Sequence, residues 1–210
     1  MWVGTSGGGL NRYLQNKQRF QRYTSNSNHS DSLSGNWVWS IYEDREGLLW
    51  IGTWGRGISR FDRRQNRFRQ YLFDAGDSSG ISNSTVTCTI EDLNGNLWIG
   101  TGRGGINLYD RENDRFYRIT EQNGLPNNSI YGILPDSSGC LWVSSNNGLA
   151  RLSWLSGDVE QGFSAAPETV TEHLRIKQFD INDGLQSNEF NQGAYFWGNP
   201  ARCILAASTD

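Results

Sequence analysis

A tryptophan-bearing motif that recurs along the chain is the feature that most constrains its fold. The stretch LWIGTWGRGISRFD at residues 49–62 returns as LWIGTGRGGINLYD at residues 97–110, and weaker copies stand at residues 1–14 and 141–153. Successive tryptophans of this motif lie 48, 48 and 44 residues apart. Periods of about 40 to 50 residues that are filled with short strands are typical of β-propeller blades. The aligned tryptophans are Trp2, Trp50, Trp98 and Trp142.

Each period holds four strand-like runs that are separated by turn residues. The first run alternates its side chains and keeps a small residue in the middle (Ser40, Cys88 and Gly132), which suits an innermost strand where neighbouring sheets crowd together. The second run carries the tryptophan, whose large apolar surface is expected to pack between sheets. The fourth run interleaves charged residues and fits an outer edge strand. We expect the first run at 37–44, 85–92 and 129–136, the third at 10–13, 58–61, 106–109 and 149–152, and the fourth at 19–23, 67–71, 115–119 and 175–179.

A carboxylate closes each first run and is followed three residues later by glycine. An acidic side chain can accept hydrogen bonds from the amides of a turn while glycine takes a positive φ, so this pattern predicts a hairpin. A calcium loop is the alternative, with residues 92–96 as its best case, but the further carboxylates and the distal glutamate of such loops are missing. The pairs are Asp44 with Gly47, Asp92 with Gly95, and Asp136 with Gly139.

The glycine-rich stretch after each tryptophan also raises the question of a phosphate loop. Such a loop must lead into a helix whose amides meet the anion, whereas these stretches lead into strands and lack a Gly-Lys-Ser/Thr ending. The formal net charge of -3 argues against a nucleic-acid partner. The three cysteines have none of the close spacings that bind zinc. We therefore expect no nucleotide, no metal and no cofactor.

These patterns predict an all-β fold, a single β-propeller region of four-stranded antiparallel blades over residues 1–210. Propellers usually have 4 to 8 blades. The first and last repeats are incomplete here, and a closed ring would have to complete its last sheet from both of them, so we expect a fragment of about four to five blades from a longer propeller, with a complete four-bladed ring as the alternative. No run of about 18 apolar residues is present, so we expect no membrane span and no signal peptide here. The expected units are a partial blade at 1–23, blades at 35–73, 84–119 and 128–179, the last with a longer connection at 154–172, and a partial blade at 190–210.

The recurrent order of a loop with Gly-Leu or Gly-Ile, then Glu-Asp, Gly, LWIGT, Gly-Ile and Tyr/Phe-Asp closely resembles the two-component regulator propeller repeat. DGLQSNEFNQGAYF at residues 183–196 is similar to the last repeat of that family's sensor region. CILAASTD at 203–210 and Ser144-Ser145 in place of Gly-Thr depart from the family pattern. The departures put the local geometry of those two strands in question.

The resemblance implies a seven-bladed propeller in the periplasmic sensor region of an inner-membrane protein. In such proteins a transmembrane helix leads to a histidine kinase or a diguanylate cyclase. The resemblance further implies a homodimer, contact with the remaining blades of the same propeller and, in part of the family, an oligosaccharide ligand.

Propeller ligands usually sit over the axis, on loops that enter the first strand or join the second strand to the third. Aromatic faces with nearby amides and guanidiniums suit sugar rings, whose C–H faces stack while their hydroxyls need polar partners. Trp39 and Tyr131 hold the same strand position and are expected in the core. The candidate ligand-binding residues are Trp37, Trp54, Arg56, Arg103, Asn146, Asn147, Asn188 and Glu189.

Two other classes of function compete with ligand sensing. Propellers also host lyases and hydrolases, but the only histidines, His29 and His173, are expected to be solvent-exposed and have no pattern that suggests a relay. We therefore assign no catalytic residue and expect no enzyme activity from this chain. A protein-interaction or dimerisation scaffold is the third possibility and would show a wide exposed apolar patch.

Overall fold

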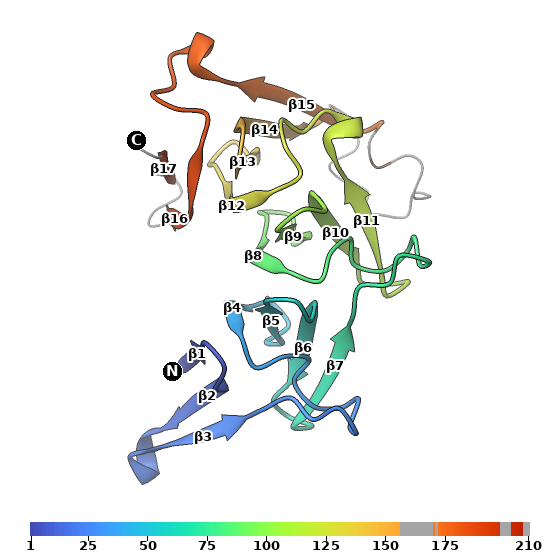
Figure 1. The fold of residues 1–210 in the computed structure, drawn as a ribbon, viewed down its shortest axis with the longest axis vertical. Helices are drawn as coiled ribbons and strands as arrows, with labels where there is room; N and C mark the ends of the chain where they lie inside the picture. Colours follow the sequence, from blue (N-terminus) through green and yellow to red (C-terminus); the bar gives the residue numbers. More distant parts are fainter. Residues whose placement is uncertain (156–169, 171, 198–202, 208–210) are drawn as a thin grey trace.

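The computed structural model describes residues 1–155, 170, 172–197 and 203–207. These residues form antiparallel sheets that follow one another along the chain, as Figure 1 shows. The first sheet has three strands, the next three sheets have four each, and the last has two. The predicted all-β propeller fold is therefore confirmed. Much of the connection expected at 154–172 lies outside the described residues.

The strand bounds agree with the expected runs to within a few residues. The first three sheets are β1 (Trp2–Thr5), β2 (Gly9–Leu14) and β3 (Arg19–Tyr23); β4 (Val38–Glu43), β5 (Leu49–Thr53), β6 (Ile58–Asp62) and β7 (Arg67–Tyr71); and β8 (Val86–Glu91), β9 (Leu97–Thr101), β10 (Ile106–Asp110) and β11 (Arg115–Ile119). The last two are β12 (Ile130–Pro135), β13 (Leu141–Ser145), β14 (Gly148–Trp154) and β15 (Leu174–Phe179); and β16 (Phe190–Trp197) and β17 (Cys203–Ala207). Short 3-10 turns stand at Gln15–Lys17, Glu121–Asn123 and Ile181–Asp183.

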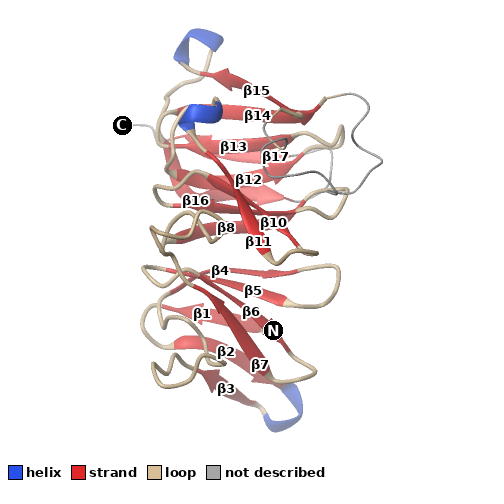
Figure 2. Cartoon of the chain, turned by 90° about the vertical axis from the view of Figure 1, so that its right-hand side faces the viewer, coloured by secondary structure: helices blue, strands red, loops and turns tan. Residues whose placement is uncertain are grey.

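The sheets fan out from their inner strands. Strand β4 packs against β8, β8 against β12, and β12 against β16, while β7 and β11 lie on the far side of the fan (Figure 1). Figure 2 shows the first four sheets from the side, stacked in chain order. The two ends of the fan lie apart, so the described residues form an open arc (Figure 1). The alternative of a closed four-bladed ring is therefore wrong for this structure.

The apolar core lies in layers between successive sheets. Leu10, Ile51 and Phe61 pack between the first and second sheets, and Trp50 packs between the second and third. Close approach is possible because the Trp strand carries glycine: a Cβ on Gly100 would lie 2.5 Å from Cys88 Sγ and 2.8 Å from Ile130 Cγ2 of the next sheet. This confirms the packing roles predicted for the tryptophan strand and for the small residue in the inner strand.

Each predicted hairpin forms, and its carboxylate does more than close the turn. Asp92 Oδ1 accepts hydrogen bonds from the amides of Asn94 and Asn96, both at 2.9 Å, while Oδ2 accepts one from the buried indole Nε1 of Trp98 at 2.9 Å. The same indole bond joins Asp44 to Trp50 at 2.8 Å and Asp136 to Trp142 at 2.9 Å. The turn glycines have φ of +79°, +88° and +82° at Gly47, Gly95 and Gly139.

A main-chain hydrogen bond joins each sheet to the next, and the sequence analysis did not predict it. We call each of these bonds a staple. The N–H of Gly105 donates to the carbonyl of Asn128, just before the next inner strand, at 2.8 Å. Gly105 has a φ of +73°, and a Cβ there would lie 2.1 Å from the carbonyl oxygen of Ile119, so only glycine fits. The equivalent bonds are Gly9 to Asn36 at 2.9 Å, Gly57 to Ser84 at 2.6 Å and Gly148 to Asn188 at 2.6 Å.

An ion cluster joins the second and third sheets at the opposite end of the inner strands. Arg111 contacts the carboxylates of Asp44 at 3.1 Å and Glu46 at 3.6 Å, and it pairs with Glu91 in its own sheet. The side chains of Asp44 and Glu91 are 0% and 7% exposed. Burial lowers the pKa of Arg111, but the hydrogen bond to Asp44 and the surrounding carboxylates outweigh it and raise the pKa above its usual value. The cluster therefore supplies positive charge to two buried carboxylates.

Candidate functional site

The loops that enter the inner strands and the loops that follow the Trp strands meet at one edge of the arc. A main-chain bond joins them in three successive sheets: Trp54 N donates to Trp37 O at 2.9 Å, Gly102 N to Thr85 O at 3.0 Å, and Asn146 N to Ser129 O at 3.1 Å. We call this edge the inner rim. Its residues are Trp37, Trp39, Trp54, Arg56, Thr85, Thr87, Gly102, Arg103, Ser129, Tyr131, Asn146, Asn147, Asn188 and Glu189.

Buried aliphatic side chains anchor the entry loops of the inner rim. Leu33, Ile81 and Leu125 stand ahead of β4, β8 and β12 and are 0%, 0% and 2% exposed. Polar contacts add to this anchoring, because Ser34 N donates to Ser59 Oγ at 2.9 Å and Ser82 N to Asn107 Oδ1 at 2.9 Å. The rim side chains are therefore carried by loops fixed at both ends.

A β-bulge near the start of each inner strand turns one side chain toward the inner rim. The register shifts between Val38 and Ser40, and likewise in β8 and β12, so that Trp39, Thr87 and Tyr131 are the extra residues. Bulges re-aim side chains and are common beside functional sites. Trp39 and Tyr131 are only half-buried. Their predicted core role is therefore wrong, because the bulge breaks the alternation on which that prediction rested.

The second sheet presents an aromatic platform at the inner rim. The rings of Trp39 and Trp54 meet edge to face with centroids 4.2 Å apart. Trp37 and Trp54 are each 55% exposed and stand on the two loops that the Trp54 N to Trp37 O bond joins. Trp37 lies over Gly7 of the first sheet, where an added Cβ would be 3.8 Å from its indole nitrogen. Trp39 thus packs against Trp54, and more than half of the surface of Trp37 and of Trp54 is exposed.

The fourth sheet presents polar groups at the equivalent positions. The hydroxyl of Tyr131 donates to Asn146 Oδ1 at 2.7 Å. Burial raises the pKa of Tyr131, and the negative charge of Glu189 raises it further. Asn146 and Glu189 are exposed. At these positions the third sheet has Thr87 and Gly102, which are smaller than the aromatic residues of the second sheet and the polar residues of the fourth.

The remaining predicted site residues differ in whether their side chains are exposed or bonded within the protein. Arg56 and Arg103 are exposed on the rim loops, and the alkyl part of Arg56 lies against Gly35, where an added Cβ would be 2.8 Å from its Cβ. Asn147 is exposed as well. Asn188 is occupied in its loop, because its Oδ1 accepts from Ile181 N at 2.9 Å and its carbonyl forms the staple to Gly148. Asn188 therefore holds the rim together.

No candidate metal site is present in the part of the chain that the structure describes. That part has no group of three or more His, Cys, Asp or Glu side chains that could hold a metal ion. At the best calcium candidate, N–H donors surround the Asp92 carboxylate, an arrangement that opposes a cation. His29 is exposed as predicted, whereas His173 is half-buried and its carbonyl accepts from Leu155 N at 2.9 Å.

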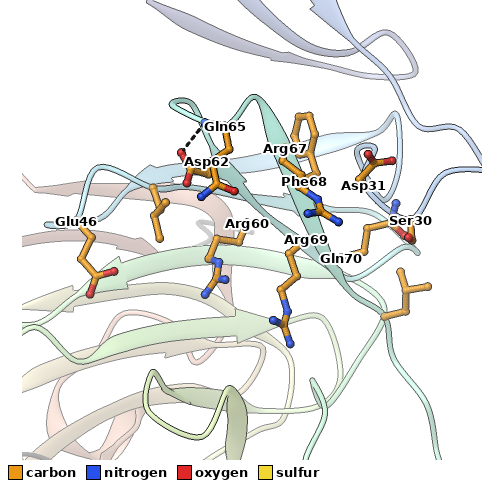
Figure 3. Close-up of a pocket in the computed structure, with 12 residues that line it drawn as sticks. Ser30, Asp31, Glu46, Arg60, Asp62, Gln65, Arg67, Phe68, Arg69 and Gln70 are labelled. Carbon is orange, nitrogen blue, oxygen red and sulfur yellow. Dashed lines mark hydrogen bonds between the residues drawn. The ribbon is translucent and has the colours of Figure 1, made fainter.

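A concavity of about 790 Å³ lies around the outer strand β7, and none of the inner-rim residues lines it (Figure 3). Arg60 and Arg69 stand directly opposite each other on β6 and β7, a like-charge pairing that normally destabilises a sheet. Arg60 donates to the Tyr109 hydroxyl at 3.0 Å, and Arg69 pairs with Asp114. The lining carries charges of both signs, and no predicted ligand-binding residue takes part in it. It is formed by Ser30, Asp31, Glu46, Leu48, Arg60, Asp62, Gln65, Arg67, Phe68, Arg69, Gln70 and Leu72.

Four-stranded sheets that fan out from a row of inner strands define this protein as a β-propeller domain. Residues 32–55, 80–103 and 124–147 match the family model described as Two component regulator propeller, and each match spans an inner strand, a Trp strand and their rim residues. These three segments are thus two-component regulator propeller repeats. Among curated proteins, no sequence matches this chain.

Solved structures with the same fold include extracellular domains of two-component systems and a lyase. The extracellular domain of the two-component system protein BT3049 from B. thetaiotaomicron is 22% identical with a TM-score of 0.75, over 98% of this chain and 25% of that one. The extracellular domain of BT4673 from the same organism is 19% identical with a TM-score of 0.60, over 100% and 33%. A virginiamycin B lyase from Staphylococcus aureus is 17% identical with a TM-score of 0.53, over 82% and 48%.

These similarities concern the fold, and the chain spans about a quarter and a third of the two extracellular domains. In the described residues, no helix has the length and hydrophobicity that crossing a bilayer requires.

Proposed function

We propose that this chain is the ligand-sensing part of a signalling protein and that its inner rim binds an oligosaccharide. The observation that carries the proposal is the aromatic platform: Trp37 and Trp54 are each 55% exposed on anchored loops. Exposed, fixed aromatic faces beside amide and guanidinium groups suit the C–H faces and hydroxyls of sugar rings. Arg56, Arg103, Asn146, Asn147 and Glu189 would supply the polar contacts at the rim.

The wider setting of the proposal follows from the repeat family. The whole protein would place this propeller in the periplasm, with further blades of the same propeller, a membrane anchor and a histidine kinase or diguanylate cyclase output, and it would act as a homodimer. In support, the chain carries the two-component regulator repeat, and two structures with its fold are extracellular domains. Protease accessibility of the full-length protein in spheroplasts tests the location: cleavage within residues 1–210 is expected from outside the inner membrane, and protection would contradict it.

Titration calorimetry on the 210-residue chain tests the ligand. The probes are cellotetraose, α-1,4-galactotetraose and their C6-carboxylated counterparts, tetraglucuronate and tetragalacturonate. We expect Trp54→Ala to weaken the binding of each bound probe by roughly tenfold or more, because a stacked aromatic face contributes about 1.5 kcal/mol. Phe20→Ala is the matched control, since Phe20 is similarly exposed at 52% but lies on β3.

Two outcomes would count against the proposal. If every probe kept its affinity in Trp54→Ala, the platform would not be the ligand site. If a bound probe were turned over, as judged by chromatography of the same samples, the chain would be a propeller enzyme.

A further inference from the structure

Two equivalent positions form a coupled pair in the second and fourth sheets of the inner rim. The first is the bulged residue of the inner strand, and the second is the first residue of the loop after the Trp strand. In the second sheet the pair is Trp39 with Trp54, in ring contact. In the fourth sheet it is Tyr131 with Asn146, joined by a hydrogen bond of 2.7 Å. The bulged residue therefore sets how its partner is presented to the rim.

The Tyr131 hydrogen bond fixes the direction of the Asn146 amide. An asparagine side chain has one carbonyl oxygen and one NH₂ group with two donors. Since the Tyr131 hydroxyl donates to Oδ1, the oxygen is held toward the inner strand and the NH₂ group is left to donate to a ligand. The main chain of Asn146 is held as well, because its N–H donates to Ser129 O at 3.1 Å.

Glu189 supplies the complementary group beside this amide. It is exposed just before β16, and the Gly148 staple to Asn188 O ties its loop to the fourth sheet at 2.6 Å. Gly148 comes two residues after Asn146, so this main-chain bond holds Glu189, the neighbour of Asn188, at the end of the rim where Tyr131 and Asn146 lie. The charge of Glu189 also contributes to the raised pKa of Tyr131. One donor and one acceptor at the same end of the rim can match hydroxyls of one sugar ring, whereas a carboxylated ring would meet the negative charge of Glu189.

We infer that the fourth-sheet end of the inner rim selects a neutral hydroxylated ring over a carboxylated one. Tyr131 positions the amide of Asn146, and the charge of Glu189 repels a carboxylated ring. The exposed guanidiniums, Arg56 and Arg103, belong to the second and third sheets, so an acidic group would be directed away from the fourth sheet. This inference rests on the proposed sugar-binding function and adds its selectivity.

The calorimetric test compares each neutral tetraose with its C6-carboxylated counterpart. Wild type is expected to bind the neutral member more tightly. Glu189→Gln should raise the affinity for the carboxylated member by roughly twofold to fivefold, the range for an exposed charge, with less than a twofold change for the neutral one. Tyr131→Phe should weaken the neutral member by roughly fivefold to tenfold. Tyr13→Phe on β2 is the control for loss of a hydroxyl elsewhere.

Nuclear magnetic resonance of the unliganded chain tests the positioning role directly. The Asn146 side-chain NH₂ signals should be ordered in wild type and Tyr13→Phe, and should become mobile in Tyr131→Phe with the melting temperature nearly unchanged. An Asn146 amide equally ordered in Tyr131→Phe would overturn the role of Tyr131. If Trp54→Ala weakened binding while Glu189→Gln left the neutral-to-acid ratio unchanged, the selectivity would be refuted and the proposed function would stand. If Trp54→Ala bound every probe as tightly as wild type, the proposed function itself would be refuted.

Discussion

The bond between a hairpin carboxylate and a buried indole gives the sharpest test of how this fold is held together. In the third sheet, Asp92 accepts four hydrogen bonds of 2.9 Å: from the amides of Asn94 and Asn96, the Asn96 side chain and Trp98 Nε1. Asp92 is 6% exposed and Trp98 is 0% exposed. In Asp92→Ala the indole N–H would stay buried with its acceptor removed.

The expected loss of stability follows from these contacts. A buried donor left without a partner costs about 1–3 kcal/mol, and each turn amide, which water can reach, costs about 0.5–1.5 kcal/mol. We expect Asp92→Ala to lower the free energy of unfolding by about 3–5 kcal/mol. A chain of this size loses roughly 2–4 °C of Tm per kcal/mol, so Tm should fall by roughly 6–20 °C. Asp74→Ala is the control, because Asp74 accepts from Gly76 N at 2.8 Å in an exposed turn with no indole.

A double-mutant cycle with Trp98→Phe isolates the indole bond. Phenylalanine keeps a ring in the core but removes the donor, so the cost of losing Asp92 should be smaller in this background. Urea unfolding of the wild type, the two single variants and the double variant gives a coupling energy, expected at about 1.5–3 kcal/mol for a bond to a charged acceptor. A coupling energy below about 0.5 kcal/mol would mean that Asp92 serves the turn alone, and the reasoning would be refuted.

Further predictions concern the joints between sheets. Gly57→Ala should lower Tm much more than Gly55→Ala: both have positive φ, but a Cβ on Gly57 would lie 2.1 Å from the carbonyl oxygen of Tyr71 at the end of β7, while Gly55 has nothing within 4 Å. Similar Tm losses would refute the staple. Arg111→Met should cost about 2–4 kcal/mol in urea unfolding, because it removes the cation that pairs with the buried carboxylate of Asp44, while Glu91 keeps Arg45; exposed Arg64→Met should be nearly neutral, and equal effects would contradict the cluster's role. Burial raises the pKa of Cys88 to about 12, so its thiol should resist alkylation at pH 9 until urea unfolds the chain, as peptide mass spectrometry would show; rapid native labelling would contradict its burial.

The antiparallel sheets could be predicted from the sequence because the same strand pattern occurs in each repeat. The tryptophan spacing and the alternation in each run correctly indicated antiparallel sheets. The constant six-residue step from Asp44 to Trp50, also seen from Asp92 to Trp98, was a readable signal for the indole bond, but a carboxylate before a turn glycine suggests a turn cap alone. The step from Gly105 to Asn128 was harder to see, because a staple between main-chain atoms leaves no side-chain pattern beyond the glycine itself.

The rim was predicted less well, and the reasons are physical. A bulge adds one residue to a strand without disturbing the letters around it, so Trp39 and Tyr131 read as ordinary inward positions. Asn188 was a candidate for ligand binding because it is an amide in a rim loop. In the structure its Oδ1 accepts a hydrogen bond from Ile181 N of the same loop, a local use that the residue type alone does not reveal. Whether Trp54 and Asn146 contact a ligand depends on groups outside the repeat pattern, which spacing alone does not encode.

The repeat separates structural positions from variable ones. In each hairpin the carboxylate, the indole and the glycine are held by one another, so a change at Asp92 or Trp98 disrupts the sheet. The bulged residue takes no part in these hairpin contacts. Its position holds Trp39, Thr87 or Tyr131 in the three sheets, whereas the residue before it is always Val or Ile. A bulge anchored by its neighbours can change its side chain at little cost to the strand. Sheets of one design can therefore present an aromatic, a small and a polar group along a single rim.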